Sequence, residues 1–213
     1  MPLTLYYHPL SSYSWKVLIA LYENGAPFER AIVNQDTHAA FVAVWPMGKF
    51  PVLVDHARGE TVPESSIIID YLDRHHPGAT RFTPTDPDSA RRTRFWDRFF
   101  DLHVHDAMQK IVGDRIRPDE SKDPFGVAEA RAKMVKACDL LEAEAAKRQW
   151  FSEGDFGLAD CAASPALYYA DKVQPLGEGR PSVAGYLARL MARPAFARVL
   201  AEAEPYFKFF PAG

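Results

Sequence analysis

The chain has 213 residues, 47% hydrophobic and 25% charged, which is ordinary for a soluble globular protein. Lys and Arg total 25 against 28 Asp and Glu, so the formal charge of -3 gives no electrostatic case for binding nucleic acid or an anionic membrane. No apolar stretch approaches the roughly 20 residues that a membrane-spanning helix needs. The length allows one or two domains, each with its own core.

The cysteine content favours a reducing compartment. Cys138 and Cys161 are the only cysteines, and they lie far apart, without histidines at metal-ligand spacing. The first residues lack the basic region and apolar run of a secretory signal. We therefore expect a cytoplasmic protein with no disulfide framework and no metal site.

The first third of the chain alternates strand-like and helix-like segments. Short aromatic and β-branched runs predict strands, and apolar residues at helical spacing predict helices. This order predicts one mixed sheet with helices on its faces. In chain order the expected elements are strand 3–7, helix 14–23, strand 28–33, helix 37–45, strands 51–55 and 60–62, and helix 65–76.

A change of composition marks the boundary between two domains. Residues 77–88 hold three prolines, a glycine and three threonines and are almost free of apolar residues. After them the apolar residues follow helical periodicity, along stripes at 96–111 and 127–145 and in shorter segments at 158–169, 183–191 and 195–203. We predict a first domain at 1–77, a linker at 78–87 and an all-helical domain at 88–213.

The turn between the first strand and the first helix is the strongest candidate for a chemical site. Ser11 and Ser14 have two residues between them, the spacing at which a pair of cysteines would allow dithiol redox chemistry, so that chemistry is excluded here. A hydroxyl beside the unpaired N–H groups of a helix N-terminus stabilises an anion such as a thiolate. A free thiol of pKa ~8.5 is mostly protonated at neutral pH, and such a site lowers that pKa. Capping of the helix by serine explains the same pattern.

Two further segments fit the binding of a peptide. Pro51 opens a strand, which indicates an edge, a bulge or a cis bond. A cis bond would leave the Phe50 N–H and C=O free to pair with an extended ligand. In Glu64-Ser65, the serine begins a helix and can bind a carboxylate, while the glutamate can accept from an ammonium group. The alternative for Pro51 is an ordinary proline in an edge strand, and the alternative for Ser65 is simple capping of the helix.

In this order the three segments resemble the glutathione transferase family, over essentially the whole chain. The resemblance implies a thioredoxin-like α/β N-terminal domain with a mixed four-stranded sheet, an all-α C-terminal domain, glutathione as co-substrate and a homodimer. Ser11 matches the hydroxyl that activates the thiol in serine-type members of the theta, zeta and related bacterial classes. The turn is most similar to the zeta class, but Tyr13 and Lys16 replace the usual cysteine and arginine.

The resemblance also implies roles for individual residues. Phe50-Pro51 matches the family's cis-proline, whose preceding backbone pairs with the cysteinyl unit, and Glu64-Ser65 matches the pair that holds the γ-glutamyl end. Lys49 and His38 are candidates for the glycyl carboxylate. Tyr7 resembles the catalytic tyrosine of other classes and is the alternative to Ser11. The expected glutathione-binding residues are thus Ser12, His38, Lys49, Phe50, Pro51, Glu64 and Ser65.

The second substrate is harder to place. Tyr13, Trp45, Phe99 and His103 are candidates for the wall of the acceptor pocket, and the alternative is that these aromatic residues are core. The segment at 206–210 either folds over this pocket or is a packed tail. In the helical half, residues 156–160 resemble the family's capping motif, with Gly157 in place of the usual Ser or Thr.

The resemblance implies an enzyme that conjugates the glutathione thiolate to a small hydrophobic electrophile. The same site would serve a glutathione-dependent isomerase, dehalogenase or peroxidase. A non-catalytic module that only binds glutathione or dimerises is a further alternative.

Overall fold

The computed structural model describes residues 2–177 and 179–211. Its first domain follows the expected order, and the predicted elements differ from the observed ones only at their ends. The first helix starts earlier than predicted, because the Ser11 side chain accepts the Ser14 N–H and caps the helix at Ser12. The elements are β1 (Leu3–Tyr7), α1 (Ser12–Glu23), β2 (Glu29–Ile32), α2 (His38–Val44), β3 (Val52–Asp55), β4 (Glu60–Pro63) and α3 (Ser65–His75).

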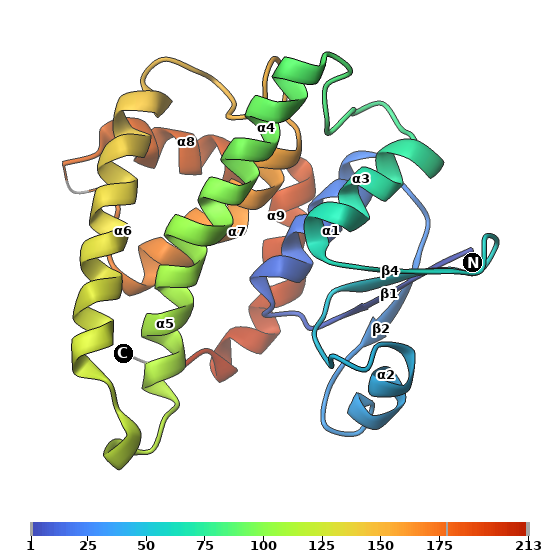
Figure 1. Cartoon of the computed structure of the whole chain (residues 1–213), viewed down its shortest axis with the longest axis horizontal. Helices are drawn as coiled ribbons and strands as arrows, with labels where there is room; N and C mark the ends of the chain where they lie inside the picture. Colours follow the sequence, from blue (N-terminus) through green and yellow to red (C-terminus); the bar gives the residue numbers. More distant parts are fainter. Residues whose placement is uncertain (1, 178, 212–213) are drawn as a thin grey trace.

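The sheet is mixed, with the strand order β2-β1-β3-β4. β1 runs parallel to β2 and antiparallel to β3, and β3 runs antiparallel to β4. Side chains alternate across the sheet, so Leu5 faces the core beneath α1 and α3, while Tyr6 stacks on Phe41 of α2 on the other face, with ring centroids 5.6 Å apart. The sheet and α2 lie to one side of Figure 1, and α1 and α3 stand between the sheet and the helical domain.

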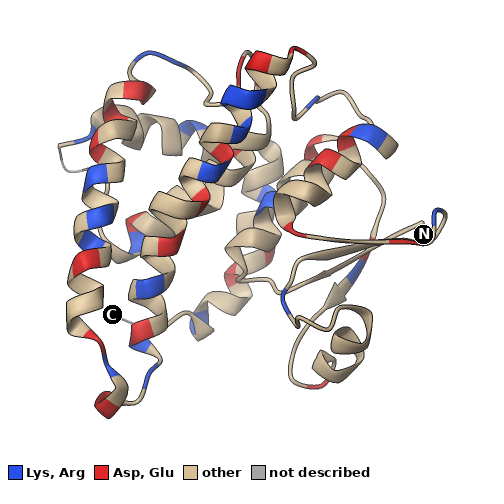
Figure 2. Cartoon of the chain, viewed as in Figure 1, with Lys and Arg blue, Asp and Glu red and all other residues tan. Residues whose placement is uncertain are grey.

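The rest of the chain is helical. α4, a π-helical segment η1 and α5 follow one another without a break, and the predicted stripe at 96–111 lies along them. Basic and acidic residues are interspersed along these helices and along α6 (Figure 2). No helix within residues 2–177 and 179–211 is long and apolar enough to cross a membrane. The elements are α4 (Pro87–Phe99), η1 (Phe100–His105), α5 (Asp106–Arg115), η2 (Asp119–Ser121), α6 (Pro124–Ala145), α7 (Leu158–Val173), α8 (Pro181–Met191), α9 (Pro194–Ala203) and η3 (Glu204–Phe209).

One hydrophobic core joins the two domains. Trp15 of α1 is completely buried, and its ring lies 4.7 Å from that of Tyr169 in α7 and 6.0 Å from that of Phe196 in α9. Near the C-terminus, Phe207 contacts Trp15, and Phe210 stacks on Tyr169 at 5.5 Å. The segment at 206–210 therefore packs against α1 and α7, in agreement with the packed-tail alternative.

The capping motif of α7 is completed by a residue from outside it. Asp160 accepts the Gly157 N–H, and Ser152 Oγ accepts the Ala159 N–H at 3.1 Å. A Cβ at Gly157 would lie 2.5 Å from the Phe82 carbonyl oxygen, closer than packing allows. Ser152 thus supplies the oxygen that the sequence lacks at Gly157, and α7 continues without interruption through Pro165.

Candidate functional site

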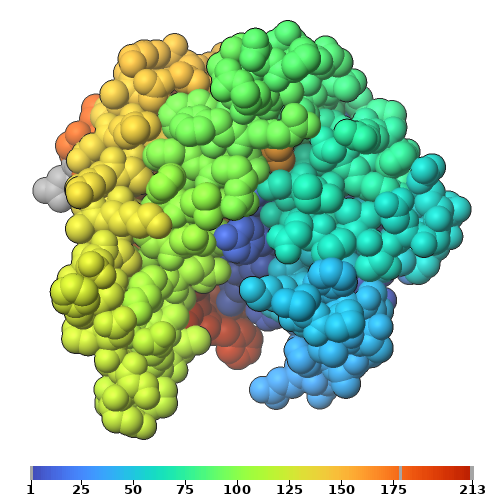
Figure 3. All heavy atoms as spheres, viewed as in Figure 1, coloured from blue at the N-terminus to red at the C-terminus, as the bar shows by residue number. Residues whose placement is uncertain are grey.

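A cavity of about 450 Å³ lies where the two domains meet. The surface is hollowed there, between the first domain and the segment formed by α4 and η1 (Figure 3). The lining comes from α1, the segment before β3, the start of α3, and α4 with η1. The lining residues are Tyr13, Trp45, Lys49, Phe50, Pro51, Glu64, Ser65, Ser66, Ile67, Arg98, Asp101 and Leu102.

The segment before β3 contributes Lys49, Phe50 and Pro51. The Phe50-Pro51 peptide bond is cis. No other described residue pairs with the N–H or C=O of Phe50, so this peptide group is open to a ligand. A Cβ at Gly48 would lie 3.7 Å from His38 Nε2, which places exposed His38 beside the Lys49 loop.

The start of α3 supplies Glu64 and Ser65 to the same cavity. Glu64 has φ of +69°, a conformation that is strained for a residue with a side chain. Ser65 is buried and begins α3, so the positive end of that helix dipole lies at the cavity. Backbone strain of this kind gathers at ligand-binding sites, which supports a binding role for Glu64.

The turn before α1 lies next to the cavity through Tyr13, which lines it, whereas Ser11 is not among the lining residues. His8 in this turn stacks on Phe50, with ring centroids 5.9 Å apart. Ser11 accepts the Ser14 N–H at 3.2 Å, which leaves the Ser11 hydroxyl proton available to a ligand. The first turn of α1 has no acidic residue that would offset the helix dipole. The turn can therefore stabilise a negative charge.

A buried ion cluster lies behind the cavity. Lys16 Nζ is 2.8 Å from Asp97 Oδ1 and 2.9 Å from Asp101 Oδ2, and it also donates to Ser66 Oγ at 3.0 Å. Burial by itself lowers the pKa of Lys16, but the two carboxylates outweigh that effect and hold the pKa above its ordinary value. Sequence reasoning missed both aspartates, although their spacing of four residues on one helix was a usable signal.

Family models match both halves of the chain. The model described as "Glutathione S-transferase, N-terminal domain" matches residues 5–80, and "Glutathione S-transferase, C-terminal domain" matches residues 124–189. Glutathione S-transferase 3 of Zea mays is 31% identical to this chain over 94% of each sequence. The chain belongs to the glutathione S-transferase family.

Two more glutathione S-transferases are similar to this chain over most of its length. Glutathione S-transferase GstB of Escherichia coli strain K12 is 29% identical over 87% of this chain and 91% of its own. A crystal structure of a glutathione S-transferase from Methylobacterium radiotolerans, in complex with glutathione sulfonate, has a TM-score of 0.80 and 30% identity over 92% of this chain and 93% of its own.

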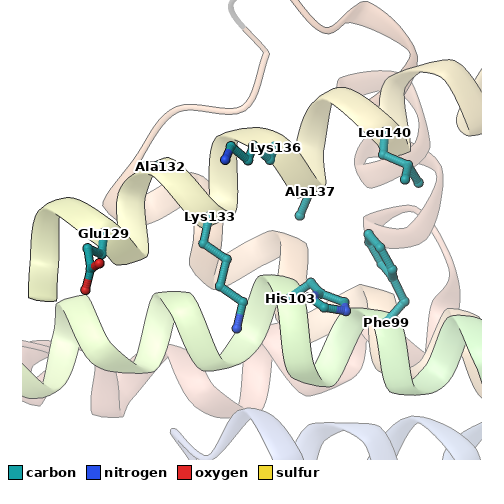
Figure 4. Close-up of a pocket in the computed structure, with 8 residues that line it drawn as sticks. All are labelled: Phe99, His103, Glu129, Ala132, Lys133, Lys136, Ala137 and Leu140. Carbon is teal, nitrogen blue, oxygen red and sulfur yellow. The ribbon is translucent and has the colours of Figure 1, made fainter.

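Phe99 and His103 do not reach the cavity of this glutathione S-transferase family member. They line a separate groove of about 480 Å³ between α4, η1 and α6, where Lys133 and Leu140 also lie (Figure 4). The residues of this helix that face the cavity are instead Arg98, Asp101 and Leu102. This placement corrects the expectation that Phe99 and His103 form part of the acceptor wall.

Ser12 is also placed differently from the expectation. Its hydroxyl is buried and lies 2.5 Å from His105 Nε2 in the helical domain. The Ser12 side chain therefore faces the domain boundary and is removed from the expected glutathione contacts.

Tyr7, the alternative thiol donor, faces a different cavity of about 190 Å³. That cavity is also lined by Arg30, Glu202 and Tyr206. Burial raises the pKa of the Tyr7 phenol, while nearby Arg30 lowers it less. Tyr7 thus lines a different cavity from Phe50 and Glu64. Within the part of the chain that the structure describes, no three His, Cys, Asp or Glu side chains come together as a metal site.

Proposed function

We propose that this protein is a glutathione transferase that joins the glutathione thiolate to a small hydrophobic electrophile. One observation carries the proposal: the peptide-binding signals at Phe50, Glu64 and Ser65 line a single cavity beside the N-terminus of α1. The complex of the Methylobacterium radiotolerans relative with glutathione sulfonate supports the same ligand here.

The cavity supports an extended pose of the tripeptide. The γ-glutamyl carboxylate would meet Ser65 and the start of α3, while its ammonium group would meet Glu64. The cysteinyl unit would pair with the open peptide group of Phe50 as an added strand. Lys49, with His38 near it, would hold the glycyl carboxylate.

This pose brings the sulfur toward the turn before α1. The Ser11 hydroxyl would donate a hydrogen bond to the sulfur, and the unpaired N–H groups of the helix start would lower the thiol pKa. The thiolate then attacks an electrophilic carbon, and the leaving group departs with its electron pair. Tyr13 and Trp45 line the cavity and are the acceptor-wall residues we retain. The protein contributes activation and positioning of the nucleophile.

The class within the family rests on the turn alone. Ser11 at the start of α1 supports a serine-type site, and the similarity of residues 11–14 to the zeta-class turn supports a zeta- or theta-like member. Isomerase, dehalogenase and peroxidase reactions would use the same thiolate, and a binding module would use the same cavity without turnover.

Two assays separate these functions. A column of immobilised glutathione tests binding, and conjugation of an aryl halide to glutathione tests transfer. We expect retention and turnover together. Retention without conjugation, isomerisation, dehalogenation or peroxide reduction would favour the binding module, and no retention would contradict the proposal.

Single substitutions test the assignment of the thiol donor. We expect Ser11→Ala to lower kcat/KM on the order of 100- to 1,000-fold, as for other lost donors to a developing anion. Ser11→Thr, which keeps the hydroxyl and the cap, should recover most of this loss, and Tyr7→Phe should leave kcat/KM unchanged. Loss of activity in Tyr7→Phe with activity kept in Ser11→Ala would reverse the assignment.

We also propose a homodimer, as the family resemblance implies, in the cytoplasm. Apolar side chains are exposed on α3, α4 and α6, including Ile67, Phe95 and Leu140. The Arg94–Asp70 ion pair at 3.3 Å joins α3 to α4 next to Phe95 in the sequence. Light scattering should give the mass of a dimer for the wild type and that of a monomer for Phe95→Glu. A monomeric wild type would contradict this part of the proposal.

A further inference from the structure

A buried hydrogen bond connects the thiol-binding turn to the helical domain. Ser12 Oγ in the first turn of α1 lies 2.5 Å from His105 Nε2, and both side chains are at least 96% buried, with exposed fractions of 4% and 2%. Water does not reach either group. If one partner is removed, the other therefore has no replacement hydrogen bond and stays unsatisfied. The contact therefore constrains where α1 begins.

The π-helical segment η1 presents His105 to α1. Asp97, Asp101 and His105 follow at intervals of four residues, and they contact Lys16 and Ser12, which are themselves four residues apart on α1. The two helices thus meet along one buried polar seam. Single π-turns are rare and often occur at functional sites. Here the π-turn ends at the histidine that reaches the first turn of α1.

The same imidazole also supports Tyr13. The rings of Tyr13 and His105 meet edge to face, with centroids 4.1 Å apart. Tyr13 lines the cavity, whereas Ser12 does not. His105 therefore contacts two consecutive residues of the turn, one directed into the domain boundary and one into the cavity.

A second residue of the helical domain holds the other end of this turn. The Tyr169 hydroxyl donates to the Leu10 carbonyl at 2.9 Å. Ser11 stands between the Leu10 and Ser12 contacts. The proposed thiol donor is thus held on both sides by the helical domain and has little freedom of its own.

The environment of the His105 imidazole keeps it in its neutral form. Burial and, to a smaller extent, the nearby Lys16 ammonium group together lower the pKa of His105 to about 3. His105 is uncharged at neutral pH, so it adds no positive charge to the thiol site. Any effect of His105 on the thiol must then act through the position of the turn.

We propose that His105 is a positioning residue for the thiol site: through Ser12 and Tyr13 it holds the first turn of α1, so that the helix N-terminus and the Ser11 hydroxyl stay directed at the glutathione sulfur. This inference rests on the proposed function. Stabilisation of a thiolate by N–H groups depends on their distance and direction, and a displacement of about 1 Å in an active site can lower a rate by about 100-fold.

Three substitutions separate positioning from packing. His105→Phe keeps a ring against Tyr13 but cannot bond to Ser12, whereas His105→Gln keeps a polar group that can. His103→Phe is the matched control, because His103 lies in the same π-segment but faces the groove toward α6. Each variant is compared with the wild type by ultraviolet absorbance of the bound thiolate against pH, and by affinity for S-methylglutathione, which has no thiol proton.

We expect His105→Phe to raise the pKa of the bound thiol by about one unit, which lowers the thiolate fraction about tenfold well below that pKa. Its affinity for S-methylglutathione should stay at the wild-type value. His105→Gln should recover most of the wild-type thiol pKa, and His103→Phe should match the wild type in both measurements. If His105→Phe fails to fold, Ser12→Ala removes the other partner of the same bond and should raise the thiol pKa in the same way.

An unchanged thiol pKa in folded His105→Phe or in Ser12→Ala would overturn the inference. So would a loss of S-methylglutathione affinity that accounts for the whole effect, since that indicates general damage to the cavity. Failure of the proposed function gives a different result. In that case the wild type itself does not bind S-methylglutathione, or leaves the thiol pKa at its value in free glutathione.

Discussion

Lys16 on α1 and Asp101 on η1 form an ion pair across the domain boundary, with Nζ 2.9 Å from Oδ2. Asp97 shares the same ammonium group, and all three side chains are buried. The pair therefore ties the thiol-binding helix to the helical domain through charges that have little access to water.

Removing this cation should destabilise the protein strongly. Lys16→Met removes the cation that Asp97 and Asp101 share and leaves Asp101 with only the more exposed Arg98 at 3.6 Å. Breaking a buried pair from one side costs about 3–5 kcal/mol. Urea unfolding followed by circular dichroism measures the free energy of unfolding. The control is Lys147→Met, which removes a 65% exposed lysine from its pair with Glu144 and should cost about 1 kcal/mol or less. Equal losses in the two variants would contradict this account of the cluster.

Substituting Glu64 should separate backbone strain from ligand binding. Glu64→Gly relieves the positive φ and should raise the free energy of unfolding by about 1 kcal/mol. Glu64→Ala keeps the strain and should leave stability nearly unchanged. Both variants lose the carboxylate, so both should raise the KM for glutathione. A Glu64→Gly variant that binds glutathione like the wild type would show that the carboxylate is not a ligand.

Restoring the family's usual capping residue should harm this protein. In Gly157→Ser the new Cβ would meet the Phe82 carbonyl and Ser152 Oγ, at 2.5 and 2.9 Å. We expect a loss of about 1–3 kcal/mol, as for overpacked cores. Thermal unfolding provides the measurement, with Ser152→Ala as a companion that should lose about 1 kcal/mol with its capping hydrogen bond. A higher melting temperature for Gly157→Ser would refute the proposed replacement of the cap by Ser152.

The free energy of unfolding should fall at acid pH because Asp55 becomes protonated. Burial raises the pKa of this carboxyl, but hydrogen bonds from His76, Tyr71 and the Arg58 N–H together outweigh burial and hold the pKa below its ordinary value of 3.8. Because the folded pKa lies below the unfolded one, the contribution to stability is complete above the unfolded pKa. It is lost as the pH falls through the folded pKa.

Asp55→Asn tests this dependence. The difference in unfolding free energy between wild type and variant should be largest near neutral pH and should shrink as the pH falls below 3.8. Urea unfolding at a series of pH values measures this difference. Asp88→Asn, at an exposed carboxylate, serves as the control and should give a difference that stays near zero. A difference for Asp55→Asn that does not vary with pH would rule out the proposed linkage.

Much of the first domain was predictable because its signals are local. Apolar periodicity and turn residues predicted every strand and helix from Leu3 to His75. Pro51 at a strand mouth left an edge, a bulge and a cis bond open, and the structure contains the cis bond. The two segments expected to bind the ends of a tripeptide, at Lys49 and Glu64, do line one cavity. Each of these features depends on residues close together in the chain.

The helical domain was predictable only in outline. The spacing of its apolar residues located the helices, but it did not reveal that the turn at Phe100–His105 is π-helical. Phe99 and His103 line the groove toward α6, while the neighbouring Arg98 and Leu102 line the cavity. Residue type alone does not show which of these side chains point toward α6 and which point into the cavity.

By itself, the sequence determined the order of elements, the mixed sheet and the segments that resemble a glutathione site, because hydrogen bonding and apolar periodicity act over short distances along the chain. Only the tertiary structure decided that Ser12 bonds to His105, 93 positions away, and that Tyr7 faces a separate cavity. The physical reason is that the direction of a buried side chain depends on the partners that the other domain brings to it, and those partners are specified only once both domains are packed together.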